Sequence, residues 1–212
     1  MGLDPDVAAL LAQLADTDVP ALSDGTIADA RANYDANPKP PPDPIAHVVD
    51  QVVPGQDHDV PVRVYADRAP GQLPVVAFFH GGGWVLSSMD GHDSLARRIA
   101  RDTGALVVSA DYRLAPEHQF PAAHDDCWSV TAWLAEHAGA WGGDPDRLVV
   151  CGDSAGGNLA AGVALRARDA GLALALQALI YPCIDDRSEA YESMEAIATG
   201  YFLSRDDMAW FW

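Results

Sequence analysis

The 212-residue sequence predicts an α/β fold, in which helices flank a mostly parallel central sheet. Two observations predict it. Short apolar runs rich in β-branched residues alternate along the chain with longer segments of helical periodicity. Several of these runs also lack interspersed polar residues, which is typical of strands buried on both faces of a parallel sheet. Strands that alternate with helices in this way build a right-handed, mostly parallel arrangement.

The first 44 residues predict a small helical segment followed by a stiff linker. Residues 6–15 are rich in Ala and Leu with apolar side chains at helical spacing, and 23–34 predict a second helix after an Asx/Ser start. Residues 37–44 contain five prolines, which remove N–H donors and fix φ. This stretch is therefore predicted to be neither helix nor central strand.

Beyond the linker, the pattern becomes that of a sheet. Two β-branched runs, 47–53 and 60–66, are separated by Pro54-Gly55-Gln56-Asp57, which predicts a hairpin. Four further strands and three helices then alternate. The strands are predicted at 73–79, 105–110, 147–151 and 172–181, and the helices at 94–101, 122–137 and 159–170.

The last residues predict the beginning of another helix. Ser204 and Asp207 have the Ser-x-x-Asp spacing of a helix start, and Met208, Phe211 and Trp212 begin an apolar stripe. The preceding strand is too apolar to be expected at a bare sheet edge. We therefore expect the sequence to be the front part of a longer domain, with the last strands of the sheet absent.

Composition argues against several classes of protein. Acidic residues outnumber basic ones 31 to 13, for a net charge of −18, so nucleic acid and anionic membranes are not expected partners. No apolar run reaches the about 18 residues of a transmembrane helix, and the acidic N-terminus does not resemble a secretory signal. Cys127, Cys151 and Cys183 lack metal-ligand spacing. We expect them to be buried, reduced thiols in a cytoplasmic protein without metal or cofactor.

A serine lies at the junction of a predicted strand and a predicted helix. Gly152-Asp153-Ser154-Ala155-Gly156 matches G-x-S-x-G between the strand at 147–151 and the helix at 159–170. So abrupt a turn strains its central residue and needs small neighbours. It presents Ser154 Oγ above the sheet, at a helix N-terminus whose dipole favours negative charge. We interpret Ser154 as a nucleophile; a glycine-rich structural turn is the alternative.

Three consecutive glycines follow the predicted strand at 73–79, in His80-Gly81-Gly82-Gly83-Trp84. Without side-chain bulk, backbone N–H groups can converge on a ligand oxygen. Together with the N–H of Ala155, they are suited to bind the oxyanion of a tetrahedral intermediate. The rival hypothesis is a phosphate-binding loop, whose spacing is absent, and the other alternative is a flexible hinge.

These motifs, with Tyr112-Arg113-Leu114-Ala115-Pro116-Glu117 and the extension of the serine motif to Asn158, resemble the hormone-sensitive-lipase-like (family IV) esterases of the α/β-hydrolase superfamily. The resemblance runs from the proline linker to the chain end. It implies the α/β-hydrolase fold and a lipase-like serine carboxylesterase for short- and medium-chain acyl esters, without cofactor. It also implies Ser154 as nucleophile and the N–H groups of Gly82, Gly83 and Ala155 as oxyanion hole.

The resemblance implies supporting roles for neighbouring residues. His80, with Gly81, orients the glycine loop instead of transferring protons, and Trp84 lines the acyl pocket. Asp153 is expected to point away from Ser154 Oγ, which favours a structural role over general acid catalysis. The domains then expected are 1–44 as N-terminal cap helices and linker, 45–185 as an incomplete core, and 186–212 as the start of a second cap segment. The oligomeric state is left open, a dimer included.

One departure from the family concerns the catalytic base. In the family, the triad acid and histidine follow the serine. All seven histidines of this sequence precede Ser154: His47, His58, His80, His92, His118, His124 and His137. A serine hydroxyl is a weak nucleophile without a base. We therefore expect the triad Asp and His beyond residue 212, and little or no turnover from these 212 residues alone.

Two alternatives remain open at this stage. One is that His118 or His124, which follow a strand end, serves as the base. The other is a non-catalytic hydrolase-fold protein that binds a small ligand, because plant gibberellin receptors resemble the same family without its catalytic histidine.

Overall fold

The computed structural model describes residues 3–15, 22–39, 41–69, 71–187 and 191–212. The chain divides into two compact units. One combines Met1–Asn33 with Ile184–Trp212, and the other is Tyr34–Cys183. The assignment of cap and core to parts of the chain stays a prediction.

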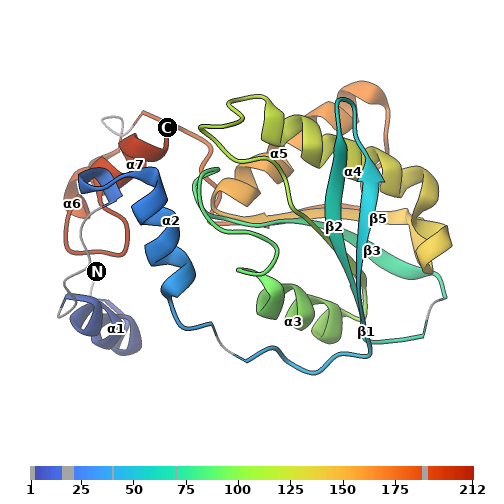
Figure 1. The fold of residues 1–212 in the computed structure, drawn as a ribbon, viewed down its shortest axis with the longest axis horizontal. Helices are drawn as coiled ribbons and strands as arrows, with labels where there is room; N and C mark the ends of the chain where they lie inside the picture. Colours follow the sequence, from blue (N-terminus) through green and yellow to red (C-terminus); the bar gives the residue numbers. More distant parts are fainter. Residues whose placement is uncertain (1–2, 16–21, 40, 70, 188–190) are drawn as a thin grey trace. The chain divides into compact units, whose positions relative to one another are not determined.

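The unit Tyr34–Cys183 is built around a six-stranded sheet in the order β1-β2-β4-β3-β5-β6 (Figure 1). Its strands are β1 (His47–Pro54), β2 (Asp59–Ala66), β3 (Leu73–Phe79), β4 (Leu106–Ala110), β5 (Gly143–Asp153) and β6 (Leu176–Ile180). The β1–β2 hairpin is antiparallel and lies antiparallel to β4, whereas β3 to β6 are parallel. The predicted fold class, α/β with a mostly parallel sheet, is confirmed.

Helices cover both faces of this sheet, α4 (Ala122–His137) and α5 (Ala155–Ala170) on one and α3 (Asp93–Thr103) on the other (Figure 1). The side chains of β3 alternate between two apolar clusters: Phe79 packs in the one with α4 and α5, and Phe78 in the one with α3. Each of these phenylalanines is fully buried, which stabilises the fold by about 2–3 kcal/mol. The uninterrupted apolar run of β3 is explained by this burial on both faces.

Two predicted strands have different bounds in the structure. β5 begins earlier than predicted, at Gly143, because its first residues pair with β3 before a register shift at Pro74/Val75. β6 begins only at Leu176, since Gly171 ends α5 in a left-handed conformation and the Leu172 N–H is held by the helix. Among the described residues β6 is an edge strand, and it is half exposed instead of buried.

In the residues that the structure describes, the other unit contains the helices α1 (Pro5–Ala15), α6 (Glu192–Ala196) and α7 (Arg205–Phe211) and the 3-10 turn η1 (Leu22–Asp24); α2 (Ile27–Ala36) crosses its boundary. The predicted helix start at Ser204 is confirmed, with a capping box to Asp207. The same Asp207 carboxylate accepts the N–H of Leu22 at 3.1 Å, which joins the two ends of the chain. The start predicted at residue 23 is wrong, because Thr26 and Asp29 exchange hydrogen bonds and begin α2 at Ile27.

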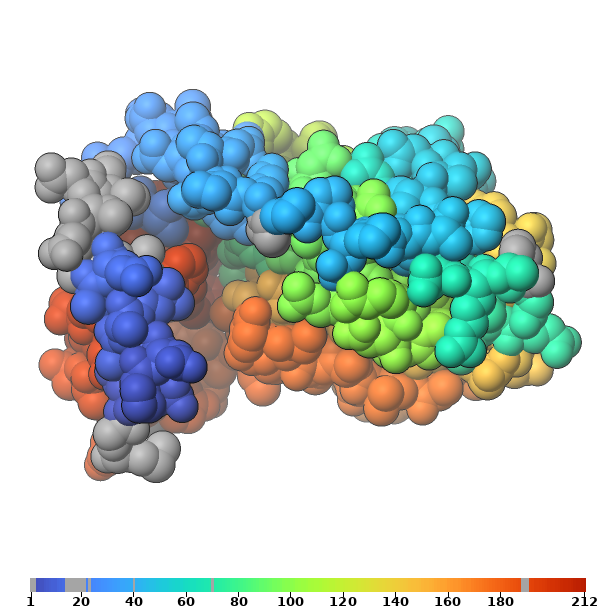
Figure 2. All heavy atoms as spheres, turned by 90° about the horizontal axis from the view of Figure 1, so that it is seen from below, coloured from blue at the N-terminus to red at the C-terminus, as the bar shows by residue number. Residues whose placement is uncertain are grey.

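The proline-rich linker forms neither helix nor strand in its described residues, 37–39 and 41–44, as predicted. In Figure 2 the chain that follows α2 runs over the surface towards the β-hairpin. Asp43 fastens it to α3: its carboxylate pairs with Arg101 at 2.9 Å, and its carbonyl accepts from Arg97. Asp43 therefore binds the linker to α3 of the unit Tyr34–Cys183.

The cysteines differ from the sequence-based expectation at one position. Cys127 and Cys151 are buried, whereas Cys183 is half-buried. Within the described ranges, no cluster of His, Cys, Asp or Glu has the makings of a metal site, and no helix has the length and apolarity needed to cross a membrane.

Candidate active site

The serine motif and the glycine loop lie at the same edge of the sheet. β3 and β5 are parallel neighbours, and Phe79, the last residue of β3, pairs with Gly152 near the end of β5. The segments that leave these strands are therefore adjacent. A Cβ on Gly156 would collide with the carbonyl of Phe79, so glycine at this position is what allows the two backbones to touch.

Ser154 forms the sharp turn between β5 and α5. Its φ of 53° and ψ of −117° place a non-glycine residue in a conformation that costs on the order of 1–3 kcal/mol. Hydrogen bonds hold it there: its N–H donates to the Ile180 carbonyl at 2.9 Å, and its carbonyl accepts from the N–H groups of Asn158 and Cys183. The side chain of Asn158 in turn donates to the Cys183 carbonyl at 2.8 Å. The segment after β6 thus clamps the strained turn.

The Ser154 hydroxyl is not paired with a base in the part of the chain that the structure describes. Its Oγ lies 3.7 Å from the Sγ of Cys183, and no histidine contacts it. His118 is exposed, and His124 packs against Gly162 of α5, where burial lowers its pKa despite a hydrogen bond to Asn158. The structure thus brings neither of these histidines to the hydroxyl.

In the glycine loop the carbonyl groups of His80, Gly81 and Gly82 are hydrogen-bonded, whereas two N–H groups of the loop are not. The His80 carbonyl accepts from the Tyr112 hydroxyl at 2.7 Å, and the Gly81 carbonyl from Nδ1 of His80 at 2.8 Å. The Gly82 carbonyl accepts from the N–H groups of residues 85 and 86. A trans peptide directs its C=O and N–H oppositely, so these bonds fix the directions of the Gly82 and Gly83 N–H groups.

Three N–H groups of the site have no protein acceptor in the described part of the chain: those of Gly82, Gly83 and Ala155. Gly82 has a φ of 126°, and a Cβ there would collide with the carbonyl of Leu86, so only glycine suits the position. Backbone donors that are oriented by the fold and lack an internal partner are the groups that stabilise an oxyanion.

His80 is a structural member of this loop. The ring is fully buried and stacks on Tyr112 with centroids 4.3 Å apart. Burial lowers its pKa to about 4, so the imidazole is neutral at pH 7. Because a carbonyl can only accept, Nδ1 carries the proton and donates to Gly81. The ring is thus hydrogen-bonded into the loop in its neutral form.

Asp153, beside the serine, binds the glycine loop with its carboxylate. Oδ1 accepts the Gly81 N–H at 3.0 Å, and Oδ2 lies 3.3 Å from Nε2 of His92. Burial alone would raise the pKa of this carboxyl, but the hydrogen bond and charge of His92 and the Gly81 N–H outweigh burial and hold the pKa below its ordinary value. Asp153 is therefore ionised at neutral pH and is unsuited to act as a general acid.

Trp84 ends the glycine loop in a left-handed conformation, with φ of 61°. Its half-buried side chain packs against the core cluster of α4 and α5. Its carbonyl accepts the Ala115 N–H at 2.9 Å, which ties the loop to the segment after β4.

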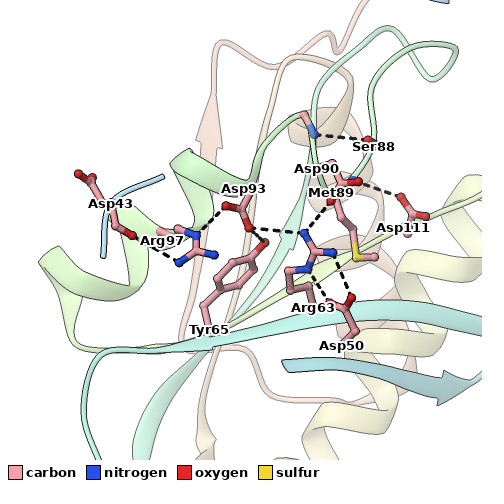
Figure 3. A network of polar contacts seen from close by, with 11 residues as sticks. Asp43, Asp50, Arg63, Tyr65, Ser88, Met89, Asp90, Asp93, Arg97 and Asp111 are labelled. Carbon is pink, nitrogen blue, oxygen red and sulfur yellow. Dashed lines mark hydrogen bonds and ion pairs between the residues drawn. The ribbon is translucent and has the colours of Figure 1, made fainter. Parts of the chain in front are cut away.

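The segment between the glycine loop and α3 is held from the hairpin side by Arg63 of β2 (Figure 3). Its guanidinium binds Asp90 at 2.7 Å, Asp50 of β1 at 2.5 Å and Asp93 of α3 at 3.5 Å. The N–H of Met89 donates to the carboxylate of Asp111 at 3.2 Å. The loop that carries the free N–H groups is thus fixed at both ends.

Comparison with known proteins identifies the family of the chain. A family model described as the alpha/beta hydrolase fold matches residues 76–212, which is more than half of the chain. The chain belongs to this family. The α/β-hydrolase fold expected from the sequence, and the resemblance to its esterases, are confirmed.

Similar solved structures cover nearly the whole chain. A hyperthermophilic esterase from Pyrobaculum calidifontis is 39% identical, with a TM-score of 0.91 over 100% of this chain and 69% of its own. A thermostable esterase from Pseudomonas putida is 36% identical, with a TM-score of 0.93 over 100% of this chain and 67% of its own.

Curated relatives include esterases of Mycobacterium tuberculosis. The carboxylic ester hydrolase LipN is 39% identical over 99% of this chain, and the carboxylesterase NlhH is 52% identical over 58% of it. A gibberellin receptor of Oryza sativa subsp. japonica is 37% identical over 72% of this chain. The aligned part is 58% of the length of LipN and 40% of that of NlhH.

Sequence patterns did not reveal three of the residues described above. His92 and Cys183 reach the site from loops distant in sequence, and Tyr112 was visible only as part of a motif. The clearest available signal was position, because Tyr112 and Cys183 each closely follow the carboxyl end of a strand in the sheet that carries Ser154.

Proposed function

We propose that the protein is a serine carboxylesterase that hydrolyses short- and medium-chain acyl esters. The observation that carries the proposal is the strained Ser154 at the N-terminus of α5, next to a glycine loop with unbonded N–H groups. Ser154 Oγ attacks the ester carbonyl and releases the alcohol, and water then hydrolyses the acyl-enzyme. The N–H groups of Gly82, Gly83 and Ala155 stabilise the oxyanion in both tetrahedral states.

The base and acid of this mechanism are proposed to come from outside these 212 residues. No histidine follows Ser154 in the sequence, and upstream histidines are engaged elsewhere or exposed. The limited share of LipN and NlhH that the chain spans supports the same proposal. A native protein with the mass of this chain, 22.5 kDa, that hydrolyses esters would contradict it.

The test compares the full-length protein with its Ser154→Ala variant on p-nitrophenyl acetate and butyrate. Loss of the nucleophile is expected to lower kcat by at least about 10⁴-fold. A fluorophosphonate probe is expected to label Ser154, as peptide mapping by mass spectrometry will show. A variant that keeps most of its rate overturns the assignment of Ser154.

The second candidate function is ligand binding without catalysis, which the similarity to a gibberellin receptor favours. The fluorophosphonate probe separates the two, since a receptor pocket without a base leaves the hydroxyl unreactive. Absence of labelling and of turnover in the full-length protein would favour the binding function.

A further inference from the structure

A hydroxyl, an imidazole and a carboxylate form a continuous chain beside the glycine loop. Ser87 Oγ lies 3.0 Å from Nδ1 of His92, and Nε2 of His92 lies 3.3 Å from Oδ2 of Asp153. The side chains of His92 and Asp153 are only 11% and 10% exposed. These residues come from the loop before α3 and from the end of β5, so their contact is tertiary.

The hydrogen bond between His92 and Asp153 has a definite direction. Asp153 is ionised at neutral pH, as argued above, and a carboxylate only accepts. Nε2 of His92 therefore carries a hydrogen and donates to it. The other ring nitrogen, Nδ1, is in hydrogen-bond contact with the hydroxyl of Ser87, which can donate or accept. The second carboxylate oxygen continues the chain to the N–H of Gly81 at 3.0 Å.

Ser87 is held in a conformation that favours glycine. Its φ is 75°, and it lies directly against the loop, because a Cβ on Gly82 would be 3.1 Å from the Cβ of Ser87. A strained residue persists where its surroundings determine it. The hydrogen bond to His92 is one such determinant.

The three groups follow the order of a catalytic triad, but their surroundings fit a different role. Ser87 Oγ lies against Gly91, where an added Cβ would come within 2.5 Å of it. At the other end of the chain, the Asp153 carboxylate accepts the N–H of Gly81, which directly precedes the two N–H groups proposed to bind the oxyanion. The chain therefore acts on the loop rather than on a substrate.

We propose that His92 and Ser87 are positioning residues of the esterase. They hold the Asp153 carboxylate so that it fixes the Gly81 N–H, and this sets the loop in which the Gly82 and Gly83 N–H groups face the oxyanion. This inference rests on the proposed function for its catalytic consequence only. The link from His92 to the Gly81 amide is testable without turnover.

The first experiment uses the full-length protein labelled with ¹⁵N-glycine. The Gly81 amide is expected to be shifted downfield and protected from hydrogen exchange. His92→Phe removes both ring nitrogens and is expected to lower its protection by about 10-fold or more, whereas His92→Gln, which keeps an N–H donor, retains part of it. His137→Phe, at the exposed end of α4, is the matched control and is expected to change nothing. An unchanged Gly81 amide in His92→Phe overturns the proposal.

The second experiment measures kinetics of the full-length variants. His92→Phe is expected to lower kcat by about 10- to 100-fold with KM nearly constant. It is expected to weaken the binding of a trifluoromethyl ketone by the same factor, because the hemiketal oxyanion of this inhibitor mimics the transition state. Ser87→Ala is the milder second variant should His92→Phe not fold, and is expected to show the same pattern at about 3- to 10-fold.

The outcomes distinguish this inference from the proposed function. If the amide responds but the wild-type enzyme is inactive and unlabelled, the esterase assignment fails while the link to Gly81 stands. Equal effects on a ground-state inhibitor and on the trifluoromethyl ketone overturn the positioning role. Fluorophosphonate labelling of Ser87 in a Ser154→Ala background overturns it as well, because Ser87 would then be a nucleophile.

Discussion

Nδ1 of His80 lies 2.8 Å from the carbonyl oxygen of Gly81, so a buried imidazole binds the peptide whose N–H belongs to Gly82. The preceding peptide is bound on both sides, by the Tyr112 hydroxyl at its carbonyl and by Asp153 at its N–H. Donors that are fixed before the substrate arrives need little reorganisation when the negative charge develops. The side chains of His80, Tyr112 and Asp153 therefore hold the backbone of the glycine loop in place.

The buried His80 makes stability depend on pH. Its pKa falls from 6.5 to about 4 on folding, so its contribution is complete above pH 6.5 and is lost as the pH falls towards 4. The loss amounts to about 3 kcal/mol from this group. His80→Asn retains a donor for the Gly81 carbonyl but does not titrate. Urea unfolding between pH 7 and 4 is expected to give a shallower decline in its free energy of unfolding than in wild type. Parallel curves for the two proteins would contradict this.

Gly82→Ala tests the backbone of the loop. The substitution meets both a φ of 126° and the carbonyl of Leu86, so we expect a loss of about 1–3 kcal/mol in stability. If the loop shifts to make room, kcat of the full-length enzyme is expected to fall by about 10²-fold or more. Gly139→Ala is the matched control, because a Cβ there meets nothing within 4 Å, and we expect a change within about 0.5 kcal/mol. Similar effects of both substitutions would refute the role of Gly82.

Sequence patterns predicted the fold where local signals and tertiary burial agree. The apolar run of β3 and the periodicity of α4 gave correct bounds, because both elements are buried along the faces that their patterns indicate. The start of β6 was missed, since its apolar run continues back through residues that form the turn after Gly171. An apolar composition is compatible with both the turn after Gly171 and the strand β6, so it does not show where the strand begins.

Motifs predicted the backbone of the candidate site better than its side-chain contacts. G-x-S-x-G and the glycine run require backbone conformations and close approaches that favour glycine, so the glycine positions alone predict them. The contact of His92 with Asp153, and that of Cys183 with Ser154, join residues 61 and 29 positions apart. Only the pairing of parallel strands brings such residues together, and no local pattern encodes it.

Arg63 stabilises the segment that follows the glycine loop. Its side chain is 18% exposed and bridges three carboxylates, so Arg63→Met leaves Asp50 and Asp90 without this cation and Asp93 with Arg97 alone. We expect a loss of about 2 kcal/mol in the free energy of unfolding, smaller in high salt. Arg168→Met is the control, because its pair with Asp169 is about two-thirds exposed and is expected to contribute less than about 1 kcal/mol. Equal losses for both variants would show that the three-carboxylate cluster is not special.

Cys183 offers a chemical probe of the space beside Ser154. It is half-buried, whereas Cys127 and Cys151 are buried, and burial raises the pKa of the Cys151 thiol to about 11 and that of Cys127 as well. Iodoacetamide is therefore expected to modify Cys183 first in the folded protein. Because its Sγ is 3.7 Å from Ser154 Oγ, we expect the added group to fill the space on this side of the hydroxyl. Modification is expected to block fluorophosphonate labelling of Ser154 in the full-length enzyme, and a Cys183→Ala variant to remain labelled under the same treatment. Full labelling of Ser154 after complete modification of Cys183 would place the acyl group on the other side of the hydroxyl.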